Sequence, residues 1–91
     1  MAIDPDLLKA VLSLKKREDV ELFFKDMFTP AEIEDISLRW KLLKDLHKGL
    51  TQRRIAEKYS ISLCKITRGS KLLKNKDSQV LKILNDQHPK E

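Results

Sequence analysis

The chain has few of the residues that make disulfides, metal sites or tight turns. Its 91 residues include one cysteine, two histidines, two glycines and three prolines, and aromatic residues make up 5%. A single cysteine, Cys64, cannot form an internal disulfide, and the histidines stand without a Cys-x-x-Cys pair, so we expect no metal. With 41% apolar and 36% charged residues, this composition favours a folded all-α protein over a disordered tail.

The sequence also lacks long apolar runs and catalytic patterns. No stretch approaches the ~20 apolar residues of a membrane span, and Asp4 and Asp6 stand where a signal peptide would need a basic start. We therefore expect a cytoplasmic protein that does not bind membranes. Because no Ser/His/Asp or Cys/His pairing, paired-carboxylate site or Gly-rich phosphate loop is evident, we expect no enzyme activity and no cofactor.

At this length we expect one domain, residues 1–91, with a small core. A chain of this size buries limited apolar surface by itself. We expect apolar helices within residues 1–28. Because the chain alone cannot bury much apolar surface, these helices favour association with a second copy. A further helix is expected over residues 77–86.

Positive charge is concentrated in the C-terminal part. The formal net charge is +5, yet residues 1–30 carry five basic and six acidic side chains. Between Lys48 and Lys76 there are nine basic residues and one acid, Glu57. Such a distribution is typical of a polyanion-binding surface, although a merely solvated basic face is the alternative.

The strongest helix signals surround residues 29–49. Thr29 and Glu32 form a capping box, Pro30 suits the first helical position, and Gly49 suits the left-handed position after the last turn. We expect this scaffold helix to end with His47 facing the helix dipole.

Residues 51–74 follow the pattern of a helix-turn-helix. Thr51 is expected to cap its first helix and Ser62 its second. Ile55 and Ile66 face inward, and Ser60 occupies the turn, where glycine is commonest. A structural αα-hairpin without DNA binding is the alternative. The second helix carries Gly69 near its middle, at a cost of about 1 kcal/mol against alanine, which suggests that another group approaches the backbone there.

These motifs together resemble the bacterial tryptophan repressor family. The resemblance rests on "FTP" opening a capped helix, on Arg39 ten residues after Thr29, on "QRR" opening the helix-turn-helix and on "ITRGS" in its second helix. It implies an intertwined helical homodimer that binds double-stranded operator DNA when L-tryptophan, the corepressor, occupies a pocket, and that controls genes of tryptophan biosynthesis. The alternatives are an effector-independent helix-turn-helix DNA-binding protein and a protein-interaction domain.

The resemblance also implies the site residues. In the family the indole ring lies between two arginines, which match Arg39 and Arg68 here. Taken alone, Arg39 also suits an ordinary ion pair with Asp35. The family has threonine and serine where this chain has Lys65 and Leu72, so we expect weaker ligand binding. The implied L-tryptophan contacts are Asp26, Phe28, Thr29, Arg39, Lys65, Arg68, Gly69 and Leu72.

DNA contacts are expected at the start of both short helices. Arg53 is expected to contact guanine N7 and O6 in a bidentate manner. Cys64 is expected to be a small exposed residue. The full set is Gln52, Arg53, Arg54, Leu63, Cys64, Lys65, Thr67, Arg68, Lys71 and Lys74.

Overall fold

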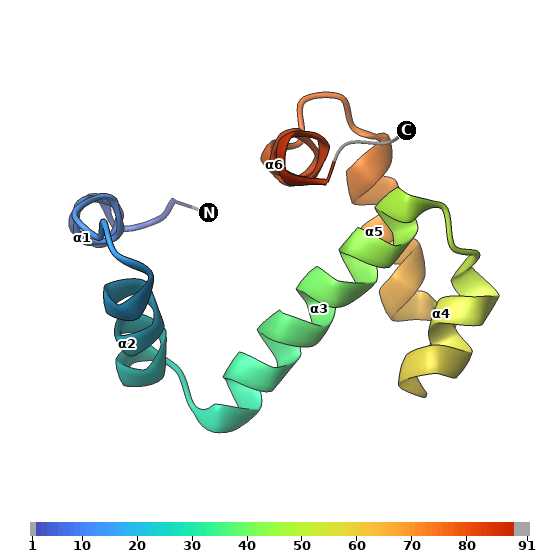
Figure 1. Ribbon diagram of the computed structural model, residues 1–91, viewed down its shortest axis with the longest axis horizontal. Helices are drawn as coiled ribbons and strands as arrows, with labels where there is room; N and C mark the ends of the chain where they lie inside the picture. Colours follow the sequence, from blue (N-terminus) through green and yellow to red (C-terminus); the bar gives the residue numbers. More distant parts are fainter. Residues whose placement is uncertain (1, 89–91) are drawn as a thin grey trace. The chain divides into compact units, whose positions relative to one another are not determined.

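The computed structural model describes residues 2–88, and this part of the chain contains helices and no strands (Figure 1). The all-α prediction is confirmed. Met1 and residues 89–91, which the domain prediction included, lie outside the described residues. The helices are α1 (Pro5–Leu12), α2 (Arg17–Met27), α3 (Pro30–Lys48), α4 (Gln52–Tyr59), α5 (Leu63–Lys74) and α6 (Gln79–Gln87).

The chain divides into two compact units, one up to Asp35 and one from Ile36 onward, so the boundary falls within α3. In the N-terminal unit, Asp4 caps α1 by accepting a hydrogen bond from the Asp6 N–H at 2.8 Å. No residue of α1 or α2 is buried, and Leu12 and Leu22 are 81% and 59% exposed. The apolar side chains of these two helices are therefore not enclosed by the unit itself.

Both ends of α3 are formed as the sequence predicts. The Thr29 N–H donates to Glu32 Oε1 at 2.9 Å, and the Glu32 N–H donates to Thr29 Oγ1 at 3.2 Å. Hydrogen bonds from the Thr29 backbone and side chain hold the pKa of Glu32 below its ordinary value. At the other end, Gly49 has φ +102°, a conformation that is open to glycine and strained for other residues.

The core of the C-terminal unit collects side chains from four helices. Ile55, Ile66 and Leu84 are completely buried, and Leu42 and Leu43 are each 4% exposed. These residues come from α3, α4, α5 and α6. Their burial fixes α4 and α5 against the C-terminal half of α3, which is the arrangement on which the site below depends.

The connection between α4 and α5 differs in one detail from the prediction. Thr51 caps α4 by accepting from the Arg54 N–H at 3.2 Å, as expected. Ser62 occupies the cap position of α5, but its side chain makes no capping hydrogen bond. Ser62 is exposed, and water can satisfy the free amides at such a helix end. Ser60 adopts the left-handed conformation at φ +54°, which explains why glycine is favoured there.

Two expectations near the C-terminal end need correction. The last helix begins at Gln79 and not at residue 77, because Asn75 Oδ1 accepts from the Asp77 N–H and holds a turn before the helix, while Ser78 is its cap. His47 does not simply face the dipole of α3. It is 3% exposed, and its Nε2 lies 2.8 Å from Asn85 Oδ1 on α6. The packing of α6 on this end of α3 buries the imidazole.

Candidate functional site

An open cavity of about 480 Å³ lies beside α3 and α5 in the C-terminal unit. Its apolar part is formed by leucine side chains from both helices, and its polar part is mainly cationic. The lining residues are Arg39, Leu42, Leu43, Lys65, Arg68, Gly69, Lys71, Leu72 and Asn75. The structure therefore brings five of the eight predicted ligand residues to one cavity: Arg39, Lys65, Arg68, Gly69 and Leu72.

Gly69 allows α3 and α5 to approach each other closely at this cavity. A Cβ atom added to Gly69 would lie 3.1 Å from Leu42 Cδ1, 3.1 Å from Leu43 Cδ2 and 3.3 Å from Leu46 Cδ1. These distances are shorter than ordinary carbon contacts. The group that approaches the glycine is thus a set of leucine side chains. This packing explains the glycine without any ligand.

The charge of the cavity suits an anion. Arg39 on α3 and Arg68 on α5 are both exposed. They share the lining with Lys65 and Lys71, and the lining contains no carboxylate. Within residues 2–88, Arg39 forms no ion pair with Asp35 or any other acid. Both guanidinium groups are therefore available to stack on an aromatic ring or to bind a carboxylate.

Three predicted ligand residues belong to the N-terminal unit. Asp26 is on α2, Phe28 follows that helix, and Thr29 precedes α3. Thr29 Oγ1 already accepts a hydrogen bond from the Glu32 N–H. Its hydroxyl still carries a proton that can be donated to a carboxylate.

The predicted DNA-contact residues gather on the exposed sides of α4 and α5. Gln52 is half-buried at the first position of α4, and the other members of the set are exposed. A second cavity, of about 370 Å³, is lined by Leu63, Cys64, Thr67, Arg68 and Lys71. Arg68 and Lys71 line both cavities. A ligand in the first cavity would thus contact residues of the exposed basic surface.

Sequence reasoning missed three side-chain hydrogen bonds that hold α4. Asp45 on α3 is 6% exposed. Its Oδ2 accepts from Lys58 Nζ at 3.0 Å and from the Tyr59 hydroxyl at 2.7 Å. Thr67 on α5 donates to Gln52 Oε1 at 3.1 Å. Nothing in the sequence indicates which of many charged and polar residues would pair in this way.

One residue of the cavity was missed although a signal existed. Asn75 lines the cavity and comes seven residues, about two helical turns, after Arg68. Residues at this spacing share one side of a helix. The spacing from Arg68 to Leu72 to Asn75 could have identified it.

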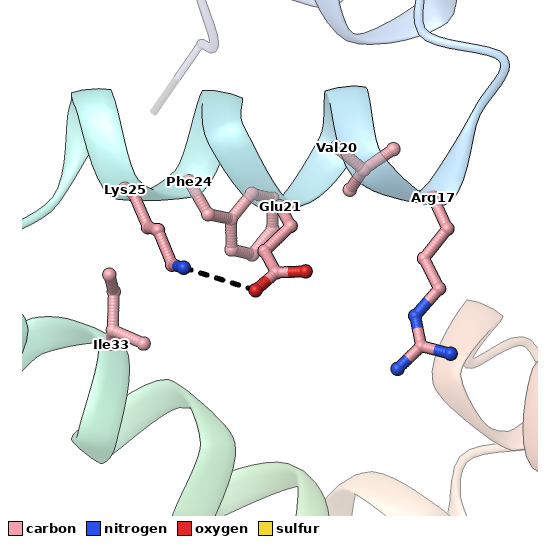
Figure 2. Close-up of a pocket in the computed structure, with 6 residues that line it drawn as sticks. All are labelled: Arg17, Val20, Glu21, Phe24, Lys25 and Ile33. Carbon is pink, nitrogen blue, oxygen red and sulfur yellow. Dashed lines mark ion pairs between the residues drawn. The ribbon is translucent and has the colours of Figure 1, made fainter.

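A separate groove of about 500 Å³ lies within the N-terminal unit. Figure 2 shows the Lys25 side chain reaching toward Glu21, and the pair is 3.1 Å apart. Val20, Phe24 and Ile33 supply the apolar lining of this groove, and Arg17 completes it (Figure 2). The groove is mainly apolar and is lined by side chains of α2 and the first turns of α3.

Neither a metal-binding cluster nor a membrane-crossing helix is seen in the described part of the chain. Residues 2–88 contain no group of three or more histidine, cysteine, aspartate or glutamate side chains placed to hold a metal ion. Over the same residues, no helix has both the length and the hydropathy that a bilayer crossing needs.

Comparison with known proteins assigns the chain to a protein family. The model of the family described as Trp repressor protein matches residues 5–88. The chain belongs to the Trp repressor family. This membership identifies it as a DNA-binding repressor of transcription related to tryptophan, and not as an enzyme.

Relatives support the assignment over most of the chain. A Trp operon repressor homolog of Chlamydia trachomatis serovar L2 is 40% identical over 81 residues, covering 84% of this chain and 86% of the relative. The homolog of Chlamydia caviae is 35% identical, with 89% and 81% covered. That of Vibrio campbellii is 33% identical, with 89% and 85% covered. No solved structure matches the chain.

Proposed function

We propose that the protein is a homodimeric, cytoplasmic helix-turn-helix repressor that binds operator DNA when L-tryptophan occupies the cavity beside α3 and α5, and that it controls genes of tryptophan biosynthesis. The observation that carries this proposal is the cavity itself. Arg39 on one helix and Arg68 on another line it together with Gly69, in a chain of the Trp repressor family.

The cavity has the size and chemistry for a planar, acidic ligand. Its volume of about 480 Å³ falls within the usual range of small-molecule sites, roughly 300–1,000 Å³. Leu42 and Leu43 offer an apolar contact for an indole ring, and the guanidinium of Arg68 can bind the carboxylate. From the family resemblance, the main-chain carbonyls of Asp26 and Phe28 remain the proposed partners of the ammonium group. The Thr29 hydroxyl remains the proposed donor to the ligand carboxylate.

We propose that α4 and α5 form the DNA-binding surface. Arg53, at the second position of α4, is exposed and free to reach a base edge. The exposed basic side chains of α5 can neutralise phosphates. The proposed contacts are Gln52, Arg53 and Arg54 on α4, and Leu63, Cys64, Lys65, Thr67, Arg68, Lys71 and Lys74 on α5.

A second candidate function is DNA binding without an effector. It is favoured by the packing of Gly69 against three leucine side chains, because this contact accounts for the glycine in the absence of a ligand. Lys65 and Leu72 also favour this candidate, since they replace the threonine and serine that the family resemblance implies as ligand contacts.

Calorimetry with L-tryptophan separates the two candidates. If the corepressor proposal is right, titrating the wild-type protein with L-tryptophan gives a saturable, stoichiometric heat of binding. Arg39→Ala weakens this binding at least tenfold, because it removes the guanidinium plane on α3 that stacks on the indole ring. Lys41→Ala is the matched control. It removes an exposed cation two residues away on the same helix, one that does not line the cavity, and should leave the affinity within about twofold.

The result that would contradict the proposal is equally direct. If wild-type protein shows no saturable heat with L-tryptophan at millimolar concentration, the effector-independent candidate replaces it. Equal losses in Arg39→Ala and Lys41→Ala would show that general positive charge, and not the cavity, attracts the amino acid.

A further inference from the structure

The start of α4 is joined to the middle of α5 by one side-chain hydrogen bond. Thr67 Oγ1 lies 3.1 Å from Gln52 Oε1, and the two residues are on different helices. Thr67 Oγ1 also lies 3.0 Å from the main-chain oxygen of Leu63, one turn earlier on α5. The hydroxyl has a single proton, which is shared between these two acceptor oxygens.

We propose that Thr67 is a positioning residue for base recognition: it holds the carboxamide of Gln52 so that the nitrogen, and not the oxygen, faces the DNA. This inference rests on the proposed function, in which the start of α4 meets the major groove. It assigns to Thr67 a role through Gln52 in addition to any contact that Thr67 makes itself.

The orientation of a glutamine side chain decides which base it accepts. Glutamine recognises adenine with both ends of its carboxamide, because Oε1 accepts from adenine N6 while Nε2 donates to N7. Oε1 can accept a second hydrogen bond, but in the proposed orientation it is turned toward Thr67 and away from the base, so that paired contact is disfavoured. The two N–H groups of Nε2 remain, and they suit the edge of guanine, whose N7 and O6 are both acceptors. We therefore expect guanine to be preferred over adenine at the base pair next to Gln52.

The position of Gln52 supports this role. It is the first residue of α4, where Thr51 and the Arg54 N–H form the cap, so the local backbone is fixed. Gln52 is half-buried while Arg53 is exposed. A side chain that is already ordered before binding loses less conformational freedom in the complex, which sharpens its discrimination.

The test is selection of bound duplexes from a random pool of DNA, using the full chain with L-tryptophan present. Wild type should select a motif that contains one base pair at which Gln52→Ala removes the preference. At that base pair, Thr67→Val should reduce the preference for guanine over adenine from roughly tenfold to less than threefold, since valine keeps the shape of threonine but loses its hydroxyl. Thr67→Ser, which keeps the hydroxyl, should retain the wild-type preference.

The matched control is Glu57→Gln on the exposed surface of α4. It should change no base preference, although loss of a negative charge can strengthen binding to every duplex alike. Circular dichroism and thermal unfolding of Thr67→Val verify that the variant is folded during the selection.

The outcomes separate this inference from the proposal beneath it. If the wild-type protein selects no motif, the proposed sequence-specific DNA binding fails. If the wild type selects a motif but Thr67→Val selects the same bases with the same preferences, only the role of Thr67 fails. Adenine as the preferred base in the wild type would overturn the assigned orientation of Gln52.

Discussion

Gly69 belongs both to the packing of α3 on α5 and to the lining of the cavity that we propose as the L-tryptophan site. Its missing side chain lets Leu42, Leu43 and Leu46 of α3 lie against the backbone of α5, and it also lines the cavity. Two of these leucines are almost fully buried, so they have little room to move. From sequence alone, alanine should improve the helix here by up to about 1 kcal/mol. The structure instead predicts that alanine at this position destabilises the protein.

Gly69→Ala should lower the free energy of unfolding by about 1 kcal/mol. Crowding a packed core typically costs about 1–3 kcal/mol, which offsets the gain in helix propensity. Urea unfolding of the ligand-free protein measures this. Lys74→Ala, at an exposed position in the last turn of α5, is the control and should change stability by less than about 0.5 kcal/mol. An increase of 1 kcal/mol in Gly69→Ala would contradict the packing argument.

The shared place of Arg39, Arg68 and Gly69 at the cavity could be predicted, because a short motif and one spacing mark these residues. "ITRGS" and the spacing from Thr29 to Arg39 are visible in the sequence. The contacts of Gly69 could not be predicted, since they depend on which leucines of α3 face α5. The pairing of Thr67 with Gln52 likewise depends on the turn at Ser60, where a serine adopts a conformation that glycine usually supplies.

At the scale of elements, Asp45 joins α3 to α4. Burial raises the pKa of its carboxyl, but hydrogen bonds from Tyr59 and Lys58 and the Lys58 charge outweigh this and hold the pKa below its ordinary value. Burial and the hydrogen bond to Asp45 raise the pKa of Tyr59, and together they outweigh the opposing effect of Lys58. The carboxylate is therefore the form that the folded protein favours.

This direction fixes the expected pH dependence. An acid whose pKa is lower in the folded state adds stability above its unfolded value, near 3.9, and this stability is lost as the pH falls through the folded value. Stability should thus be full at neutral pH and decline below about pH 4. The pKa of Glu32 is shifted in the same direction, so the test compares proteins that differ only at Asp45.

Asp45→Asn should cost about 1–3 kcal/mol at pH 7, because it weakens a buried, charge-assisted hydrogen-bond group. The difference from the wild type should shrink as the pH approaches 3. Chemical unfolding at several pH values measures both effects. A difference that stays constant between pH 7 and pH 3 would show that the charge of Asp45 contributes nothing.

Some helix boundaries could be predicted from the sequence and others could not. The limits of α3 were predictable because a capping box and a C-terminal glycine mark them. The start of α6 was misplaced by two residues, since the turn held by Asn75 resembles a helix start in sequence. The burial of His47 was missed because only the folded chain brings α6 against it.

At the scale of the whole molecule, the N-terminal unit is the part that we propose binds a second copy of the chain. Its helices α1 and α2 bury no residue, although large apolar side chains are exposed along both. The groove lined by Val20, Phe24 and Ile33 adds to this apolar surface (Figure 2). Large exposed apolar surfaces usually mark interaction sites.

Sedimentation should show a dimer at tens of micromolar, with and without L-tryptophan. Leu12→Lys should shift the protein toward the monomer, because it places a charge on a side chain that we expect the second copy to cover. Lys15→Ala, an exposed cation three residues later, should leave the dimer intact. A monomeric wild type under both conditions would contradict the homodimer proposal.

Tryptophan-dependent DNA binding tests the central proposal most directly. A duplex obtained by selection from a random pool is titrated with the wild-type protein at fixed ionic strength, with and without a saturating concentration of L-tryptophan. The proposal predicts an affinity for this duplex at least tenfold higher with L-tryptophan, an increase that Arg39→Ala abolishes while its binding without ligand stays unchanged. Equal affinity with and without L-tryptophan in the wild-type protein would contradict the corepressor role and leave a DNA-binding protein that needs no effector.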